Sequence, residues 1–152
     1  MTRIRVAGDP SEVEAALAVR HDVFVLEQGV PADLERDAQD EEADHFVAYD
    51  GGDPVGAGRL VVEPPGFEGT DPALGPVGHL GRLAVRPQAR GARLGAALVT
   101  AIEVRARDRG LAVMALSSQT YAIPFYERLG YAAHGGEFDD AGLPHRWMRR
   151  EL

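Results

Sequence analysis

The chain of 152 residues contains no cysteine and no lysine. The absence of cysteine excludes disulfides, thiolate metal sites and an acyl-cysteine intermediate, so any acyl transfer must proceed without a cysteine nucleophile. The absence of lysine excludes a P-loop, because that phosphate-binding motif requires a lysine.

Long apolar runs are missing as well. No stretch of about 18 apolar residues is present, and residues 1–6 lack the apolar segment of a signal peptide. We therefore expect a cytoplasmic protein that does not enter a membrane. The length suits a single domain, which we place at 1–152, and the hydrophobic share of 45% is ordinary for a globular chain.

The formal net charge of −8 argues against a nucleic-acid binder, whose affinity depends on clustered basic residues. The charge is unevenly spread: seven arginines lie within residues 82–109, whereas seven carboxylates lie within residues 33–44. The first segment suits an anion and the second a cation, but both patterns are also typical of solvated surfaces. We expect no metal site, because residues 33–44 lack the glycine at the sixth position of an EF-hand loop.

Strand and helix patterns alternate along the chain. The capping signal Asp9-Pro10-Ser11-Glu12 predicts the start of an amphipathic helix that ends before Gly29. Further helices are predicted from Gly91 to Arg109 and over 123–129, and residues 63–78 are predicted to be a loop. Strands are predicted at 3–7, 45–49, 55–62, 79–85, 111–116, 131–133 and 146–149. The unit over 79–116 should form a right-handed parallel crossover.

The stretch RGARLGAALV, residues 90–99, begins as a glycine-containing turn and continues as an apolar helix. The first N–H groups of a helix lack partners and carry partial positive charge, so they bind phosphate oxygens well. Gly91 and Gly95 would let a ligand approach the backbone, and Arg90 and Arg93 add charge. The dinucleotide pattern G-x-G-x-x-G is absent here. The turn therefore indicates another kind of phosphate loop, although glycines are also ordinary turn residues.

This stretch, together with the strand before it, resembles the acetyl-CoA pyrophosphate loop of the GNAT superfamily of N-acetyltransferases. The usual form is Arg or Gln, two residues, Gly, one residue, then Gly or Ala. The chain departs from it at Arg93, where the family generally has glycine. A second segment, Gln119–Tyr131, resembles the one that flanks the pantetheine arm. Further likeness to the ElaA-like branch lies in VFVLEQ (23–28), the acidic segment leading to His45, GRL (81–83) and GLPH (142–145).

The resemblance implies an α/β (α+β) fold: a mixed, mostly antiparallel twisted sheet of about six to seven strands. It also implies helices on both faces and a central parallel strand pair splayed around the CoA site. The implied reaction moves an acetyl group from acetyl-CoA to a primary amine of a small molecule or peptide, by direct attack in a ternary complex. The residues that it assigns to acetyl-CoA binding are Leu83, Ala84, Val85, Arg90, Gly91, Ala92, Arg93, Leu94, Gly95, Ala96, Gln119, Phe125 and Tyr126.

The resemblance also suggests catalytic residues. Tyr126 matches the position that donates a proton to the departing thiolate in many family members, and a phenol with a pKa near 10 suits a thiolate near 8.5. Backbone N–H groups around 83–85 would polarise the thioester carbonyl. His79, His45 and His145 are alternative general bases, and Glu27 or a water relay stay open.

Two other classes of function stay open. One is a non-catalytic acyl-CoA-binding or sensor domain that keeps the phosphate loop. The other is a phosphate-binding module unrelated to CoA, which leaves the pattern at Gln119–Tyr131 unexplained. The sequence names neither the acceptor amine nor the oligomeric state, and a homodimer is one alternative.

Overall fold

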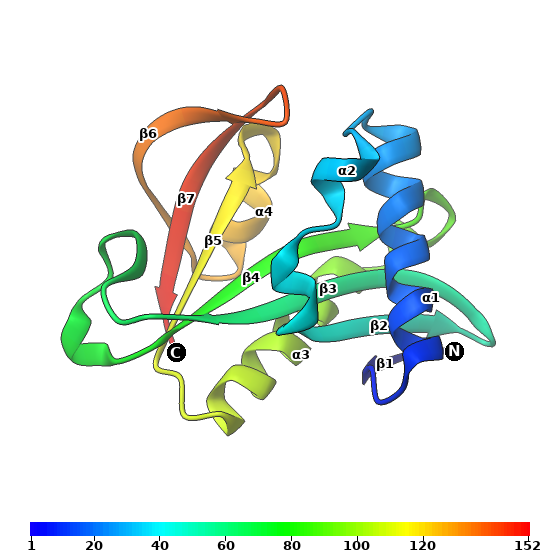
Figure 1. Cartoon of the computed structure of the whole chain (residues 1–152), viewed down its shortest axis with the longest axis horizontal. Coiled ribbons are helices and arrows are strands. Elements are labelled where there is room, and N and C mark those ends of the chain that lie inside the picture. The colour runs from blue at the N-terminus through cyan, green and yellow to red at the C-terminus, as the bar shows by residue number, and fades with distance from the viewer.

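The computed structural model describes residues 1–152 and contains one seven-stranded sheet (Figure 1). The strand order is β1-β2-β3-β4-β5-β7-β6, and every neighbouring pair is antiparallel except β4 and β5. The strands are β1 (Thr2–Val6), β2 (Asp44–Asp50), β3 (Asp53–Glu63), β4 (Val77–Val85), β5 (Val113–Gln119), β6 (Ala132–Asp140) and β7 (Leu143–Glu151). The helices are α1 (Pro10–Arg20), α2 (Ala32–Glu35), α3 (Leu94–Asp108) and α4 (Ile123–Arg128).

Helices cover both faces of the sheet because successive strand residues point to opposite sides. On β2, Phe46 belongs to the core under α3, whereas the next residue, Val47, packs with α1. On β3, Gly58 lets α3 lie close, since a Cβ there would come within 2.8 Å of Ile102 Cδ1. The predicted fold class is confirmed.

The first helix starts where the sequence predicts, but its cap differs in detail. Asp9 is the N-cap and accepts a hydrogen bond from the Glu12 N–H at 2.9 Å. The Glu12 side chain does not return to the Asp9 N–H to complete a capping box. The Glu12 carboxylate accepts from the Gly8 N–H at 2.9 Å and pairs with Arg5 at 2.8 Å.

The helix continues past Arg20 as the π-helical turn η1 (His21–Glu27). Such turns are rare and often occur at functional sites. The following acidic segment, which had no predicted structure, forms α2 and the 3-10 helix η2 (Ala38–Glu41). Asp37 caps η2 by accepting a hydrogen bond from the Gln39 N–H.

Several predicted boundaries are wrong, and β5 runs over Val113–Gln119 rather than 111–116. Helix α3 begins at Leu94 rather than Gly91, because Arg93 has a left-handed conformation (φ 62°, ψ 22°) that ends the preceding loop. Strands β6 and β7 extend well beyond 131–133 and 146–149. β6 continues through Gly135 and Gly136, which lie in a register shift between the paired residues His134 and Phe138. None of the helices has both the length and the apolar character needed to span a bilayer.

Candidate active site

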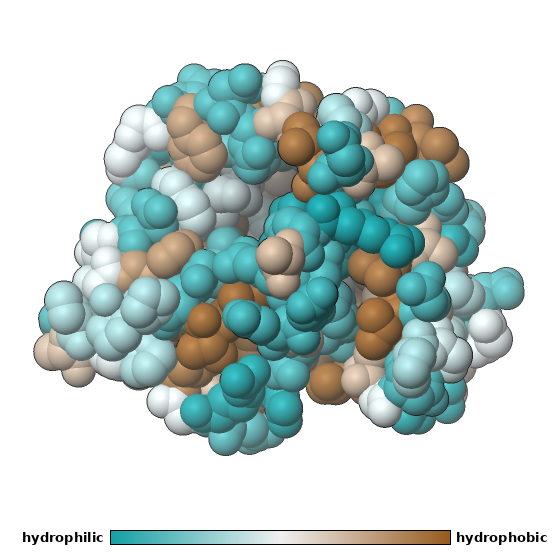
Figure 2. All heavy atoms as spheres, viewed as in Figure 1, coloured by the Kyte–Doolittle hydropathy of each residue, from teal (hydrophilic) through white to brown (hydrophobic).

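A cleft opens where the two parallel strands at the centre of the sheet separate. β4 and β5 pair only through Gly78–Met114 and His79–Ala115. Beyond these pairs β4 runs on to Val85 and β5 to Gln119 without further backbone pairing between the two strands. The resulting cleft has a volume of about 500 Å³, and Figure 2 shows it as a hollow beside the α2 segment.

A bulge shapes the β4 side of the cleft. Between the pairs Ala57–Ala84 and Arg59–Gly81, two β4 residues, Arg82 and Leu83, lie opposite one β3 residue. Arg82 has a left-handed backbone (φ 52°), which is uncommon for a residue with a side chain. A bulge of this kind bends a strand and turns its side chains, so it directs Arg82 and Leu83 toward the cleft that both line.

The loop before α3 presents backbone donors. No backbone N–H from Gly91 to Ala96 has a hydrogen-bond partner within the chain. The N-cap residue, Arg93, provides no side-chain cap, and the positive φ of 86° at Gly91 suits glycine. Gly95 leaves room for a neighbouring ring, because a Cβ there would lie 3.3 Å from Phe125 Cζ. The loop therefore presents six consecutive free donors at the positive end of a helix.

The arginines near this loop are less available than the sequence suggests. Arg90 makes a bidentate ion pair with Glu27, at 2.6 and 2.8 Å, and also donates to the Val85 carbonyl. This hydrogen bonding lowers the pKa of Glu27 below its usual range. Arg86 pairs with Asp22 at 2.9 Å. Arg93 alone among the three has no carboxylate partner, so the backbone is the principal source of free donors.

Of the other predicted acetyl-CoA residues, Leu83, Gln119 and Tyr126 line the cleft, whereas Ala84, Val85 and Phe125 do not. Leu83 and Gln119 line it from β4 and from the end of β5, and Gln119 Nε2 donates to Gln28 Oε1 at 2.8 Å. The Ala84 side chain instead packs in the α1 core, so only its backbone can meet a ligand. Phe125 packs against the start of α3 and does not line the cleft.

Tyr126 projects from α4 into the cleft and is nearly buried, with 9% of its surface exposed. Its ring lies edge-on to Phe125 and Tyr131, with centroid distances of 4.9 and 6.1 Å. Burial raises the pKa of the Tyr126 phenol well above its usual value. The hydroxyl has no hydrogen-bond partner within the chain, although it is not sealed from the cleft.

The three predicted histidines have different positions. His79 and His145 both line the cleft, from β4 and β7. His145 Nδ1 donates to the Leu143 carbonyl at 2.8 Å, and its ring stacks on Phe138. His45 lies outside the cleft: it is 5% exposed, and its Nε2 lies 2.8 Å from the Asp40 carbonyl oxygen.

Sequence analysis missed Glu63, which is the partner of His79. Glu63 Oε2 lies 2.9 Å from His79 Nδ1, and both side chains are mostly buried. A carboxylate at this distance holds the proton on Nδ1 and leaves Nε2 as the acceptor. Burial lowers the pKa of His79, with Arg59 and Arg82 acting in the same direction, whereas Glu63 opposes the shift. Glu63 stands at the end of a predicted strand, and nothing in the sequence connects it with residue 79.

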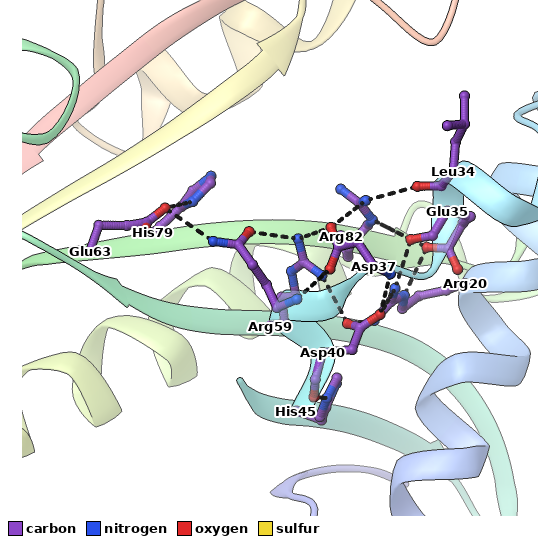
Figure 3. A network of polar contacts seen from close by, with 11 residues as sticks. Arg20, Leu34, Glu35, Asp37, Asp40, His45, Arg59, Glu63, His79 and Arg82 are labelled. Carbon is purple, nitrogen blue, oxygen red and sulfur yellow. Dashed lines mark hydrogen bonds and ion pairs between the residues drawn. The ribbon is translucent and has the colours of Figure 1, made fainter. Parts of the chain in front are cut away.

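The acidic segment is not a free surface. Its carboxylates pair with arginines from α1, β3 and β4, and Gln39 connects this network to Glu63 (Figure 3). Burial alone would raise the pKa of Asp40, but hydrogen bonds from Arg20 and the Asp37 N–H hold that pKa well below its usual range. The network fixes the acidic segment along one side of the cleft. Its members are Arg20, Glu35, Asp37, Asp40, Arg59 and Arg82.

Comparison with known proteins agrees with this architecture. The family described as "Acetyltransferase (GNAT) domain" matches residues 6–152. The chain is 38% identical over 147 residues to the "uncharacterized N-acetyltransferase YjcF" of Bacillus subtilis, covering 96% of this chain and 97% of the relative. An acyl-CoA N-acyltransferase from Pseudomonas aeruginosa superposes with a TM-score of 0.80 at 28% identity, covering 99% and 98% of the two chains. ElaA of Escherichia coli shares the fold, with a TM-score of 0.77 at 22% identity and coverage of 99% and 98%.

Strands β4 and β5 separate, and the helix that follows β4 begins with free N–H groups. Together with these relatives, this arrangement defines an acyltransferase. The chain belongs to the GNAT family of acetyltransferases. Membership implies an acyl-CoA donor and an amine-bearing acceptor. Among the described residues, no group of three or more His, Asp or Glu side chains is arranged to hold a metal ion.

Proposed function

We propose that the protein transfers the acetyl group of acetyl-CoA to a primary amine by direct attack within a ternary complex. The observation that carries this proposal is the row of free N–H groups from Gly91 to Ala96 beside the unpaired edge of β4. The diphosphate of CoA would accept from these donors at the positive end of α3. The pantetheine arm would lie along residues 83–85 with Gln119 beside it, and Phe125 would support the start of α3 by packing against Gly95. The reaction would take place in the cytoplasm.

In the proposed reaction the amine attacks the thioester carbonyl carbon, so that a C–N bond forms and the C–S bond breaks. Backbone N–H groups of residues 83–85 would stabilise the negative charge that develops on the carbonyl oxygen. The amine proton passes to a general base, and the departing thiolate takes a proton from the Tyr126 hydroxyl. Because the chain has no cysteine, no acyl-cysteine stage intervenes.

We assign the general base to His79 rather than to the other predicted candidates. Both His79 and His145 present Nε2 to the cleft, but only His79 has a carboxylate partner, Glu63, to stabilise the imidazolium that forms. His45 is remote from the cleft. Glu27 is held in its ion pair with Arg90. The lowered pKa of His79 keeps its imidazole neutral near pH 7, as a base requires.

The assignment predicts a shift in pH dependence when Glu63 is replaced by glutamine. Loss of the carboxylate lowers the pKa of His79 further, because Glu63 is the group that raises it. A base works above its pKa, so the acidic limb of kcat/KM should move to lower pH while the maximal rate falls. Glu41→Gln is the matched control, since Glu41 is an exposed carboxylate that makes no ion pair or side-chain hydrogen bond with His79 or with the network. If Glu63 had only a structural role, its replacement by glutamine would lower the rate without moving the acidic limb of kcat/KM.

A second prediction concerns the ion pair between Arg90 and Glu27 beside the loop. Glu27→Gln releases Arg90 for the diphosphate, so CoA should bind about two- to fivefold more tightly, the range for an exposed ion pair. Glu14→Gln removes an exposed carboxylate of α1 that pairs with no arginine and leaves Arg90 paired, so its affinity should match the parent. Calorimetric titration with CoA measures both. Unchanged or weaker binding by Glu27→Gln would exclude Arg90 as a diphosphate ligand.

Binding of CoA itself tests the proposed function first. A ligand that binds the native state raises the melting temperature as its concentration increases. We expect CoA to raise it at millimolar concentration, and dephosphorylated pantetheine, which lacks the diphosphate, to raise it less. Absence of any shift with CoA would contradict the proposal.

A further inference from the structure

We infer that the acceptor is a primary amine on an apolar, preferentially aromatic, body that carries no carboxylate or phosphate. The inference rests on the proposed function, because it concerns the acceptor side of the same cleft. Four features of that side support it: a wall of aromatic rings, the pairing of its cations, a carboxylate without an ion-pair partner, and an apolar rim.

The aromatic wall is formed by side chains from β4, β6 and β7. Trp147 lies at its centre, stacked on Phe138 with a centroid distance of 6.1 Å and tilted against His79 at 5.5 Å. Phe138 also stacks on His145 at 5.8 Å. All four rings line the cleft. Stacked rings of this kind offer flat apolar area to an aromatic or aliphatic group.

The cations on this side are already neutralised. Arg59 is 3% exposed and donates to Asp37 and Asp40 at 2.7 to 2.9 Å. Arg82 donates to the Glu35 carbonyl and to Asp37, at 3.0 and 3.1 Å. An acidic group on the acceptor would therefore find no free partner in a cleft where desolvating an unpaired charge is costly.

One lining carboxylate has no ion-pair partner. Asp140 lies at the end of β6, beside the hairpin turn, and lines the cleft with Phe138 and Trp147. It is exposed and makes neither a salt bridge nor a side-chain hydrogen bond within the chain. A free carboxylate beside aromatic rings suits an ammonium group attached to an apolar body.

The rim of the cleft is also apolar. Leu34 and Tyr121 line the cleft from opposite sides and are 54% and 75% exposed. Figure 2 shows apolar surface beside the hollow, over the α2 segment. Large exposed apolar side chains next to a cleft indicate contact with an apolar ligand.

The test compares amines that differ by one group. With acetyl-CoA as donor, kcat/KM for 2-phenylethylamine should exceed that for phenylalanine, which adds only a carboxylate, by about tenfold or more. Glucosamine should likewise exceed glucosamine 6-phosphate, and 2-phenylethylamine should exceed butylamine, which lacks the ring. Preference for phenylalanine or for glucosamine 6-phosphate would overturn the inference.

The variant Asp140→Asn tests whether the free carboxylate binds the ammonium group of the acceptor. We expect KM for 2-phenylethylamine to rise about two- to fivefold with kcat unchanged, as for an exposed charge interaction. The control is Asp139→Asn, because Asp139 is the adjacent carboxylate, points to the other face of β6 and does not line the cleft. Equal KM values for the two variants would contradict recruitment of the ammonium by Asp140.

Binding of the same amines separates failure of the inference from failure of the proposed function. Calorimetry on the CoA-loaded protein needs no turnover. Tighter binding of 2-phenylethylamine than of phenylalanine, without turnover of any amine, would support the acceptor class and contradict only the catalytic proposal. Tighter binding of phenylalanine would overturn the acceptor class whether or not turnover occurs.

Discussion

Replacing Tyr126 by phenylalanine is expected to lower kcat and kcat/KM together by about 10²- to 10⁴-fold, the range for a positioned general acid. The hydroxyl makes no hydrogen bond within the chain, so its removal should leave the fold intact. CoA affinity should also be unchanged, because the proton is needed only as the C–S bond breaks. The phenol pKa, raised by burial, keeps Tyr126 protonated through about pH 10, so the defect should persist across the alkaline range.

Tyr49→Phe is the matched control for this experiment. Tyr49 lies on β2 and does not line the cleft, and its hydroxyl likewise makes no hydrogen bond within the chain, so loss of that hydroxyl should leave the rate unchanged. Rates are compared at saturating acetyl-CoA from about pH 6 to about pH 10, which brackets the ordinary thiol pKa of about 8.5. Equal turnover of Tyr126→Phe and the parent throughout this range would remove Tyr126 from the mechanism and leave proton delivery to water.

Replacing His79 by glutamine is expected to cost about 10²- to 10⁴-fold in kcat as well, because the amine loses its proton acceptor. A glutamine amide can still donate to Glu63. The main interaction that changes is therefore the packing of the residue 79 side chain against Phe67 and Trp147. The defect should shrink at alkaline pH, where more of the amine is already deprotonated.

The comparison variant is His145→Gln, since His145 also presents Nε2 to the cleft but lacks a carboxylate partner. We expect it to lose less than about tenfold, far below the effect at His79. Thermal melts of both variants establish that each is folded. A large loss for His145→Gln with near-normal turnover for His79→Gln would show that the general base is His145 on β7 and not His79.

Features that depend on neighbouring residues were predictable from the sequence. The Asp9 cap, the glycine stops and the alternation of strands gave the correct element order, and the family resemblance supplied the sheet topology. Strand ends were harder to predict, because β6 and β7 pair on both sides of a register shift that contains Gly135 and Gly136, and glycine has low strand propensity. The start of α3 was missed because an arginine rarely adopts the left-handed conformation that Arg93 has.

The site was only partly predictable, because its chemistry depends on contacts between distant segments. Sequence analysis placed His79 on the central strand, but its partner Glu63 comes from a neighbouring strand 16 residues earlier. The positive charge expected from Arg90 is offset by Glu27, 63 residues away. Likewise, pairing of the acidic segment with Arg20, Arg59 and Arg82 appears only when three elements of the fold come together. Charge counts along a chain do not predict which charges remain free.

Release of free thiol from acetyl-CoA in the presence of primary amines tests the central claim most directly. The panel spans aromatic, aliphatic, sugar and peptide amines, and thiol release is followed with a thiol reagent, to which the cysteine-free chain contributes no background. We predict that at least one amine releases thiol in proportion to acetylated amine, with initial rates that depend on both substrates as a ternary complex requires. If CoA binds but no amine in the panel releases thiol above the rate of spontaneous hydrolysis, the protein is a non-catalytic acyl-CoA-binding domain, and the proposed acetyl transfer is contradicted.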